Sequence, residues 1–183
     1  LNCERGSGPT PDPCGECETC SRIWSGGASL DVVEIDAASN RGVDDARDLR
    51  ERAMYAASQE GHHKVYIVDE AHMLTREAWN ALLKILEEPP PGVVFVFATT
   101  EPDKVLQTIR SRTHHYSFRL VPPETLSAYL EQLCAAEGVT VGRGVIPLVV
   151  RAGQGSVRDS LSVLDQLMAG AGLVHPGKLV KVL

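Results

Sequence analysis

Val65-Tyr66-Ile67-Val68-Asp69-Glu70-Ala71-His72 is the stretch that decides the fold, because four apolar residues lead directly into two carboxylates. Such a run predicts a buried strand of a parallel sheet with charge at its carboxyl end. Open α/β sheets bind their ligands at that edge. In nucleoside triphosphatases an acidic residue there holds Mg²⁺, and a neighbouring Glu polarises the attacking water. Asp69 and Glu70 are therefore candidate catalytic carboxylates, and the alternative is an acidic pair that is only solvated.

Apolar runs and helical segments alternate on both sides of this strand. The expected strands are residues 30–35, 65–68, 93–98 and 115–120, and the expected helices are residues 44–59, 75–88 and 104–112. This alternation predicts right-handed crossovers and an α/β fold whose parallel sheet is covered on both faces. Residues 1–29 are rich in Gly, Pro, Ser and Cys, and they predict a loop that something other than packing holds in place.

The character of the chain changes at Val121-Pro122-Pro123. From Glu124 onward the apolar residues recur at helical spacing, which predicts a small all-helical domain. We therefore expect an α/β core over residues 1–121, a helical domain over 122–172, and a tail over 173–183 that we interpret as the start of a further domain.

Four cysteines near the start of the chain have the spacing of a metal site. Cys3, Cys14, Cys17 and Cys20 form Cys, ten residues, Cys-x-x-Cys-x-x-Cys, with Gly15 and several prolines that let the backbone turn tightly. Four thiolates make a closed tetrahedral zinc site without an open position for water, which is typical of structural zinc. The alternative is a set of disulfides or free thiols.

Composition and charge limit the possible functions. The 183 residues are 43% hydrophobic, carry a formal net charge of -6, and include no apolar run near 18 residues or signal peptide. We expect a cytoplasmic protein without a membrane span. The negative charge argues against a broad basic face that coats nucleic acid, so any contact with DNA must be local or shared.

An ATP site also needs a phosphate loop, Gly-x-x-x-x-Gly-Lys-Ser/Thr, whose backbone N–H groups surround the phosphates. The sequence contains no such run, because its only Gly-Lys, Gly177-Lys178, is followed by Leu. The chain also starts at Leu1 without Met, so we interpret it as a fragment of a longer polypeptide. The fragment alone should not hydrolyse ATP.

Four further residues are candidates for contact with phosphate. Thr99 and Thr100 end the strand after the acidic one, so a hydroxyl there could sense the γ-phosphate or orient water, although threonines favour strand ends in any case. Arg112 and Arg158 stand near helix ends, where Arg is suited to bidentate phosphate contact. The alternative for both is an ordinary surface arginine.

Taken together, these motifs resemble the gamma/tau clamp-loader subunits of bacterial DNA polymerase III, ATPases of the AAA+ superfamily. The stretches that carry the resemblance are the cysteines over 3–20, Glu34 to Ser39, Lys64 to Leu74, Asn80 to Pro90, Ala98 to Thr100, Ser111-Arg112 and Gly155 to Leu161. The resemblance implies an AAA+ parallel-sheet core, truncated at its N-terminus, with an inserted zinc module and a helical lid domain. It places the phosphate loop upstream of Cys3.

The resemblance also implies roles for individual residues. Asp69 and Glu70 would be the Walker B acids, Thr100 in preference to Thr99 would be sensor 1, Arg158 would be sensor 2, and Arg112 would be the arginine finger. A finger acts on ATP of the neighbouring subunit, so the active unit would be a ring or an arc. The usual Ser-Arg-Cys of the family is Ser-Arg-Thr here, which leaves Arg112 in place and affects only residue 113.

The implied activity is ATP-driven loading of the sliding clamp on primed DNA, within the DNA polymerase III holoenzyme at the replisome. The implied cofactors are structural Zn²⁺, and ATP with Mg²⁺ in the full-length protein. The implied partners are other clamp-loader subunits, the sliding clamp, the polymerase core and primer–template DNA. Arg41 and Arg76, each beside an expected helix start, are candidates for DNA phosphate contact, with solvated charge as the alternative.

Two other functions fit parts of the pattern. A non-hydrolysing clamp-loader subunit of the delta-prime kind shares the zinc module and the Ser-Arg pair, and the missing phosphate loop suits it. The acidic pair with Arg158 favours the ATPase. Asp-Glu-Ala-His is also a helicase motif, but such helicases would show Ser-Ala-Thr after the next strand, where this chain has Ala98-Thr99-Thr100.

Overall fold

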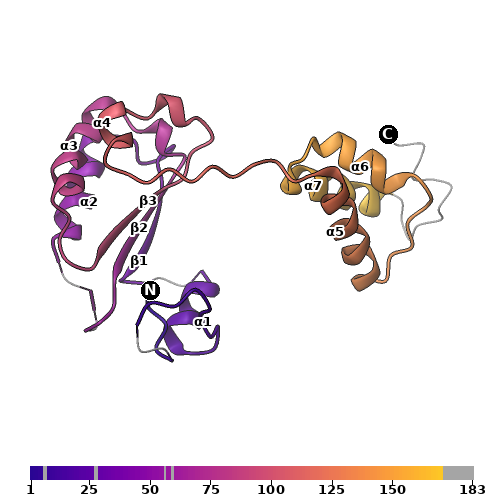
Figure 1. The fold of residues 1–183 in the computed structure, drawn as a ribbon, viewed down its shortest axis with the longest axis horizontal. Helices are drawn as coiled ribbons and strands as arrows, with labels where there is room; N and C mark the ends of the chain where they lie inside the picture. Colours follow the sequence, from indigo (N-terminus) through magenta and orange to yellow (C-terminus); the bar gives the residue numbers. More distant parts are fainter. Residues whose placement is uncertain (6–7, 27–28, 56, 59, 171–183) are drawn as a thin grey trace. The chain divides into compact units, whose positions relative to one another are not determined.

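The computed structural model describes residues 1–5, 8–26, 29–55, 57–58 and 60–170. The chain divides into two compact units, Leu1–His115 and Tyr116–Leu183, and Figure 1 shows the elements of each. Among the described residues, no helix combines the length and the apolar character needed to cross a bilayer.

The first unit is built on a parallel sheet of three strands in the order β1-β2-β3. The strands are β1 (Val32–Asp36), β2 (Lys64–Asp69) and β3 (Val93–Phe97). Asp36 lies opposite Asp69 in the register, and Val68 lies opposite Phe97, so the three carboxyl ends share one edge. The three strands expected around the acidic pair and their parallel arrangement are confirmed.

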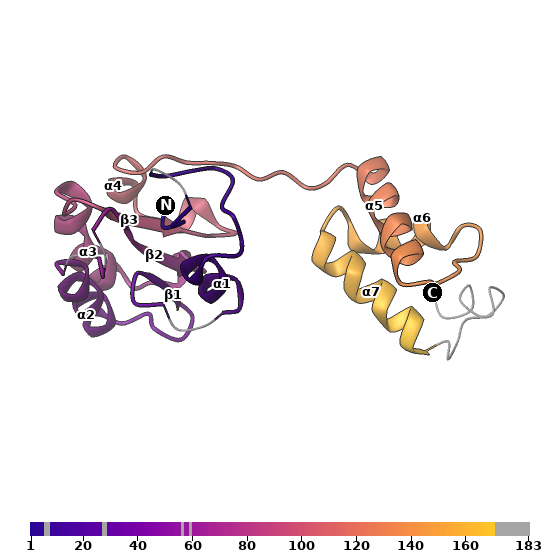
Figure 2. The ribbon, with the colours of Figure 1, turned by 90° about the horizontal axis from the view of Figure 1, so that it is seen from below.

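The helices α2 (Val43–Ala53) and α3 (Arg76–Glu87) lie on one face of this sheet (Figures 1 and 2). Both start at a capped turn: the Asp45 carboxylate accepts a hydrogen bond from Gly42 N–H (3.0 Å), and the Thr75 hydroxyl accepts one from Ala78 N–H (3.1 Å). The α3 helix stops before the prolines that start at residue 89, as expected.

Side chains from the sheet and these helices form the core of the first unit. Its largest fully buried members are Trp79, Tyr66, Leu82 and Ile109. The Tyr66 ring stacks on Phe95 with 5.3 Å between the ring centroids. Burial of each such side chain contributes roughly 1.5–3 kcal/mol to the stability, so this face of the sheet holds β2, and with it the acidic pair, in a fixed position.

The opposite face of the sheet differs from the sequence-based expectation. Val94 and Val96 alternate with the core residues of β3, and Val96 is 44% exposed. Within the described residues of the first unit, α2 and α3 cover the face that carries Tyr66 and Phe95 (Figure 1), and on the other face Val65 is buried. Among the described residues, the expectation of a sheet covered on both faces is therefore wrong at Val96 on β3, whereas the second face is covered at Val65.

Three further elements also differ from expectation. Residues 1–29 contain a short helix, α1 (Glu18–Trp24), because Cys17 caps it with its sulfur. The helix expected over 104–112 is shorter, with a 3-10 turn η2 (Pro102–Lys104) followed by α4 (Gln107–Arg110). Residues 115–120 form no strand, and the apolar residues that suggested one, Tyr116, Phe118 and Leu120, are exposed.

The second unit is helical in its described part, as expected. It contains α5 (Pro123–Ala136), α6 (Val145–Gly153) and α7 (Val157–Gly170). Their apolar faces meet in one core, whose fully buried members include Leu126, Leu130 and Val149. The tail expected over 173–183 lies outside the described residues.

Candidate active site

The candidate site lies at the carboxyl edge of the sheet, where β1, β2 and β3 end. Asp69 ends β2, is exposed, and accepts a hydrogen bond from Glu70 N–H at 2.9 Å. Its backbone carbonyl accepts one from Ala37 N–H (3.0 Å), which fixes the end of β1 against it. The Asp69 carboxylate is therefore presented to solvent from a rigid strand end, as a ligand for Mg²⁺ requires.

Asp36 stands at the same edge, opposite Asp69, but its carboxylate has a different role. One oxygen accepts from Ala38 N–H and the other from the Ser39 hydroxyl, both at 2.8 Å. The Ser39 hydroxyl and the Ala38 N–H lower the pKa of Asp36 below its usual range. Both oxygens thus stabilise the turn after β1, which leaves Asp69 as the carboxylate available to a ligand.

Glu70 has a backbone conformation that few residues other than Gly adopt. Its φ and ψ are 46° and 42°, in the left-handed region, where a residue with a Cβ costs about 1–2 kcal/mol. The next residue, Ala71, is completely buried, and its N–H donates to Ala98 O at 2.9 Å. This bond joins the ends of β2 and β3 and helps to hold Glu70 in its strained turn. Strain of this kind often accompanies functional sites.

The Glu70 side chain lies next to His72, on the 3-10 turn η1 (Ala71–Met73). Glu70 Oε2 is 3.3 Å from His72 Nδ1, and this oxygen is buried without a hydrogen-bond partner. His72 Nδ1 is also 3.0 Å from the Thr99 hydroxyl, and its Nε2 is 3.3 Å from Glu101 Oε2. His72 is not among the residues that the sequence motifs predicted for the site, although its place three residues after Asp69 was the available signal.

The two threonines after β3 are in different surroundings. Thr99 is half-buried against His72, and its hydroxyl accepts from Glu101 N–H at 3.0 Å. Thr100, which the family resemblance favours as sensor 1, is exposed. The structure thus brings Thr99 into contact with the side chains around Glu70, and leaves Thr100 open to solvent.

Arg112 lies just after α4 and is engaged within its own chain. Its guanidinium is 2.7 Å from the Glu87 carboxylate at the end of α3 and donates to Thr108 O, also at 2.7 Å. Both partners of the ion pair are partly exposed, at 36% and 48%. Breaking such a pair costs roughly 0.2–1 kcal/mol, so Glu87 holds Arg112 without preventing it from reaching a phosphate.

Arg41 and Arg76, the candidates for DNA contact, are close together. Thr75 N–H donates to Arg41 O at 3.1 Å, and Arg76 is the first residue of α3. Both arginines are exposed. The structure therefore places two positive side chains beside the starts of α2 and α3.

Arg158 belongs to the second unit, where it is exposed on the first turn of α7. The turn before it is tight: Gly155 has φ of +87°, and its carbonyl accepts from Val121 N–H at 3.0 Å. The Ser156 hydroxyl then accepts from Asp159 N–H at 3.2 Å and caps α7. These contacts fix the direction in which α7 presents Arg158.

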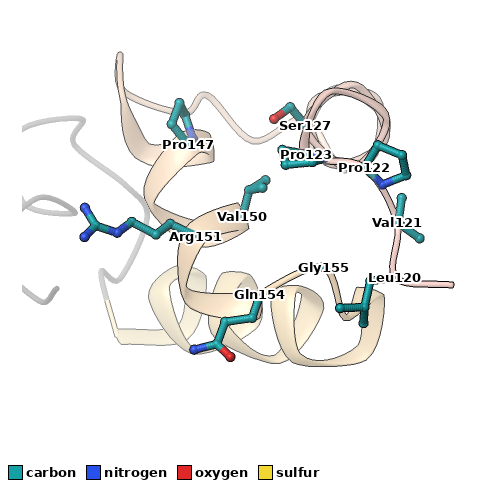
Figure 3. A pocket seen from close by; sticks show the side chains of 10 residues that line it. All are labelled: Leu120, Val121, Pro122, Pro123, Ser127, Pro147, Val150, Arg151, Gln154 and Gly155. Atoms are coloured by element: carbon teal, nitrogen blue, oxygen red, sulfur yellow. The ribbon is translucent and has the colours of Figure 1, made fainter.

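The second unit also contains an apolar pocket, shown in Figure 3. Pro123, Val150 and Leu120 line it, and the guanidinium of Arg151 points away from these side chains (Figure 3). None of the candidate catalytic residues lines this pocket.

The four cysteines form one cluster in which all four sulfurs lie within 4.8 Å of one another. A tetrahedral zinc site with Zn–S bonds of about 2.3 Å has sulfurs about 3.8 Å apart, so a modest contraction would bring these sulfurs to zinc distances. Backbone N–H groups of Cys14, Cys17 and Cys20 donate to the sulfurs of Cys3, Cys14 and Cys17 at 3.3–3.5 Å.

These N–H groups favour the ionised form of Cys3 and Cys14, whereas contacts with the neighbouring thiols and burial raise the pKa of Cys20 to about 12. The N–H groups of Glu16 and Cys17 lower the pKa of Cys14 to about 6, and that of Cys14 lowers the pKa of Cys3. Thiolates are the form that binds zinc. The donor set and its hydrogen bonds therefore fit a structural zinc ion.

The cysteine cluster is attached to the sheet by a buried side chain, Asn2. Its amide donates to His63 O at 2.8 Å and accepts from His63 N–H at 2.7 Å, and Asn2 is only 5% exposed. Because His63 precedes β2, Asn2 continues the hydrogen-bonding pattern of the sheet and fixes the cluster to it.

Two family models match the chain. One is described as "DNA polymerase III, delta subunit" and matches residues 1–122, and the other is described as "DNA polymerase III clamp loader subunit, ATPase lid domain" and matches residues 125–172. Three curated relatives show the similarity. The gamma/tau subunit of DNA polymerase III from Mycobacterium tuberculosis is 61% identical over 176 residues, the tau subunit from Bacillus subtilis 44% over 172, and that from Escherichia coli 44% over 169.

These alignments cover 96%, 94% and 92% of this chain, but 30%, 30% and 26% of the relatives. The chain thus spans less than a third of their length. Among solved structures, a DNA polymerase III gamma subunit-related protein from Thermotoga maritima is 29% identical with a TM-score of 0.55, covering 84% of this chain and 51% of that one. The RuvB Holliday junction branch migration motor from the same organism has a TM-score of 0.65 at 12% identity, covering 88% and 54%, and supports the fold alone.

Proposed function

This chain belongs to the clamp-loader subunits of DNA polymerase III, in their gamma/tau group, and we propose that it is part of the ATPase motor of the loader. In this proposal ATP binding and hydrolysis drive the loading of a sliding clamp on primed DNA. The partners are other loader subunits, the clamp, the polymerase core and primer–template DNA.

The observation that carries the proposal is the pair of carboxylates at the carboxyl end of β2. Asp69 is exposed, and Glu70, which follows it, is partly buried and has a left-handed backbone. Asp69 would hold Mg²⁺, because its oxygens face solvent from a rigid strand. Glu70 would polarise the attacking water, since its side chain follows Asp69 at the same strand end and is 42% exposed. Bound Mg²⁺–ATP supplies the phosphoryl group and the charge that these residues act on.

The remaining site residues contribute to this chemistry from other elements. A threonine at the end of β3 would respond to the γ-phosphate; the family resemblance favours Thr100, and the contact with His72 favours Thr99. Arg158 would reach the nucleotide from the lid. Arg112 would leave Glu87 and stabilise the transition state in the neighbouring subunit, a contribution of about 10³ to 10⁵ in rate.

Two further sites support the assembly. Cys3, Cys14, Cys17 and Cys20 would bind one structural zinc ion, which suits a segment with few buried apolar residues. The paired arginines at positions 41 and 76 would contact DNA phosphates, because helix starts favour anions.

The second candidate is a structural loader subunit that does not hydrolyse ATP. The match of residues 1–122 to the delta-subunit family favours it. The arrangement of Glu70 favours the motor, because a residue with a Cβ in the left-handed region costs stability that a purely structural subunit has no reason to retain.

ATP turnover by the intact protein, assembled with its partner subunits, tests the proposal. Glu70→Gln should abolish multiple turnover while nucleotide affinity stays within about twofold of the wild type, because the amide keeps the shape but not the basicity. Glu51→Gln, at an exposed position of α2, is the matched control and should behave as wild type. Full turnover by Glu70→Gln would exclude Glu70 as the residue that polarises water, and absence of turnover in the wild-type assembly would exclude the motor function.

A further inference from the structure

His72 is the most enclosed titratable side chain next to the acidic pair, and the mechanism above gives it no task. Its side chain is 9% exposed, whereas those of Glu70 and Glu101 are 42% and 46% exposed. An imidazole that packs between two carboxylates and a hydroxyl at a strand edge has three polar contacts to satisfy. The geometry of those contacts indicates what the ring does.

Hydrogen bonds around Thr99 define the orientation of the ring. The Thr99 hydroxyl already accepts from Glu101 N–H, so its own proton is available to donate to His72 Nδ1 at 3.0 Å. The proton of the neutral ring then lies on Nε2 and faces Glu101 Oε2 at 3.3 Å. This tautomer, assigned from the hydrogen-bond network, gives Nδ1 a hydrogen-bond partner and places the proton of Nε2 within ion-pair distance of a carboxylate.

Glu101 is in turn held by another charge. The Lys104 ammonium is 2.8 Å from Glu101 Oε2, and its hydrogen bond lowers the pKa of Glu101. The ring of His72 is therefore fixed at both nitrogens by residues that follow β3. The position of the His72 ring therefore depends on the position of the residues at the end of β3.

Glu70 contacts the same ring without a hydrogen bond. A ring nitrogen has one in-plane direction for a hydrogen bond, and Nδ1 uses it for Thr99, so Glu70 Oε2 at 3.3 Å has no donor. The ring thus limits where the Glu70 carboxylate can go, while 42% of the Glu70 side chain stays exposed. A movement of Thr99 would move the ring and with it Glu70.

We propose that His72 is a positioning residue that couples Thr99 at the end of β3 to the catalytic Glu70 at the end of β2. It does not touch the reacting atoms. Its imidazole holds the Glu70 carboxylate in the orientation that activates water, and transmits to it the displacement of Thr99 when nucleotide binds. This inference rests on the proposed ATPase function.

Substitutions at position 72 in the intact, assembled protein test the coupling. His72→Ala should lower kcat at least tenfold while nucleotide affinity stays within about twofold, since only the orientation of Glu70 changes. Asn can place an amide near Nδ1, whereas Gln reaches toward the position of Nε2. His72→Asn should therefore keep more of kcat than His72→Gln. Met73→Ala, on the same turn, is the control and should retain wild-type kcat.

A double substitution separates coupling from loss of structure. Thr99→Ala should lower kcat, and adding His72→Ala to it should lower kcat little further, because both changes remove the same link. Independent, multiplying effects would overturn the proposal, as would a wild-type kcat in His72→Ala, or equal losses in the Asn and Gln variants. Failure of the ATPase function itself has a different signature, namely no ATP turnover by the wild-type assembly.

Discussion

The contact between α6 and α7 sets the direction of Arg158, and a single methyl group should disrupt it. Gly153 is the last residue of α6, and a Cβ at this position would lie 2.8 Å from Ser160 N and 2.9 Å from Ser160 Cα on α7. It would also overlap the Ser160 hydroxyl. The hydroxyl can rotate, but the backbone atoms can only move with the helix.

The magnitude follows from two opposing effects. Replacing Gly by Ala inside a helix stabilises it by about 0.8–1 kcal/mol. Ordinary contacts start at about 3.4 Å, so α7 must shift by about half an ångström, and overpacking of this kind costs about 1–3 kcal/mol or more. We expect Gly153→Ala to destabilise the lid by about 1–2 kcal/mol, measured by urea unfolding.

Two companion variants isolate the cause. Ser160→Ala removes a buried hydroxyl without a hydrogen-bond partner, so it should be neutral or slightly stabilising. In the Ser160→Ala background, Gly153→Ala should lower the stability of the lid by less than it does in the wild type. It should still destabilise the lid, because the close contacts with the backbone N and Cα of residue 160 remain. If Gly153→Ala instead raises the stability of the lid, the gain in helix propensity exceeds the cost of the clash. The close contact described between α6 and α7 would then be contradicted.

Four other predictions concern the first unit. The purified protein should contain about one equivalent of zinc by elemental analysis, and Cys17→Ser should lose the metal; a metal-free wild type would refute the site. Because hydrogen bonds lower the pKa of Asp36, its contribution to stability is present above the ordinary carboxyl range and lost as the pH falls through the lowered value, so Asp36→Asn should flatten the acid side of the stability profile. Arg112→Ala in the intact assembly should lower hydrolysis by about 10³-fold or more and spare nucleotide binding, whereas loss of binding would reassign the residue. Glu87→Ala frees Arg112 and should change stability by less than about 1 kcal/mol.

The sequence was sufficient to predict the helices and strands that local sequence features determine. The apolar run before Asp69, the threonine cap at position 75 and the proline stop after α3 each have a local physical signature, and the structure contains the strand and the helix that they predict. The helical periodicity after residue 124 likewise predicts the three helices of the lid.

Other features depend on contacts that a linear pattern does not contain. The alternation Tyr116, Phe118, Leu120 is typical of a strand, but a strand also needs a neighbour with free hydrogen-bonding groups, and these residues are exposed instead. The helix α1 starts at Cys17, whose sulfur caps it, whereas the cysteine spacing predicted only metal binding for this residue.

The candidate site, too, could be predicted from the sequence only in part. The acidic pair follows from its position after an apolar strand. The left-handed backbone of Glu70 and the contacts of His72 depend on the bond between Ala71 and Ala98, which joins segments that are far apart in the sequence.

Binding of Mn²⁺, as a paramagnetic substitute for Mg²⁺, tests the central claim most directly. In the intact protein with ATP, the electron paramagnetic resonance signal of bound Mn²⁺ should be present in the wild type. It should be strongly reduced in Asp69→Asn, with ATP itself still bound. An unchanged Mn²⁺ signal in Asp69→Asn would contradict the assignment of the metal to the carboxyl end of β2.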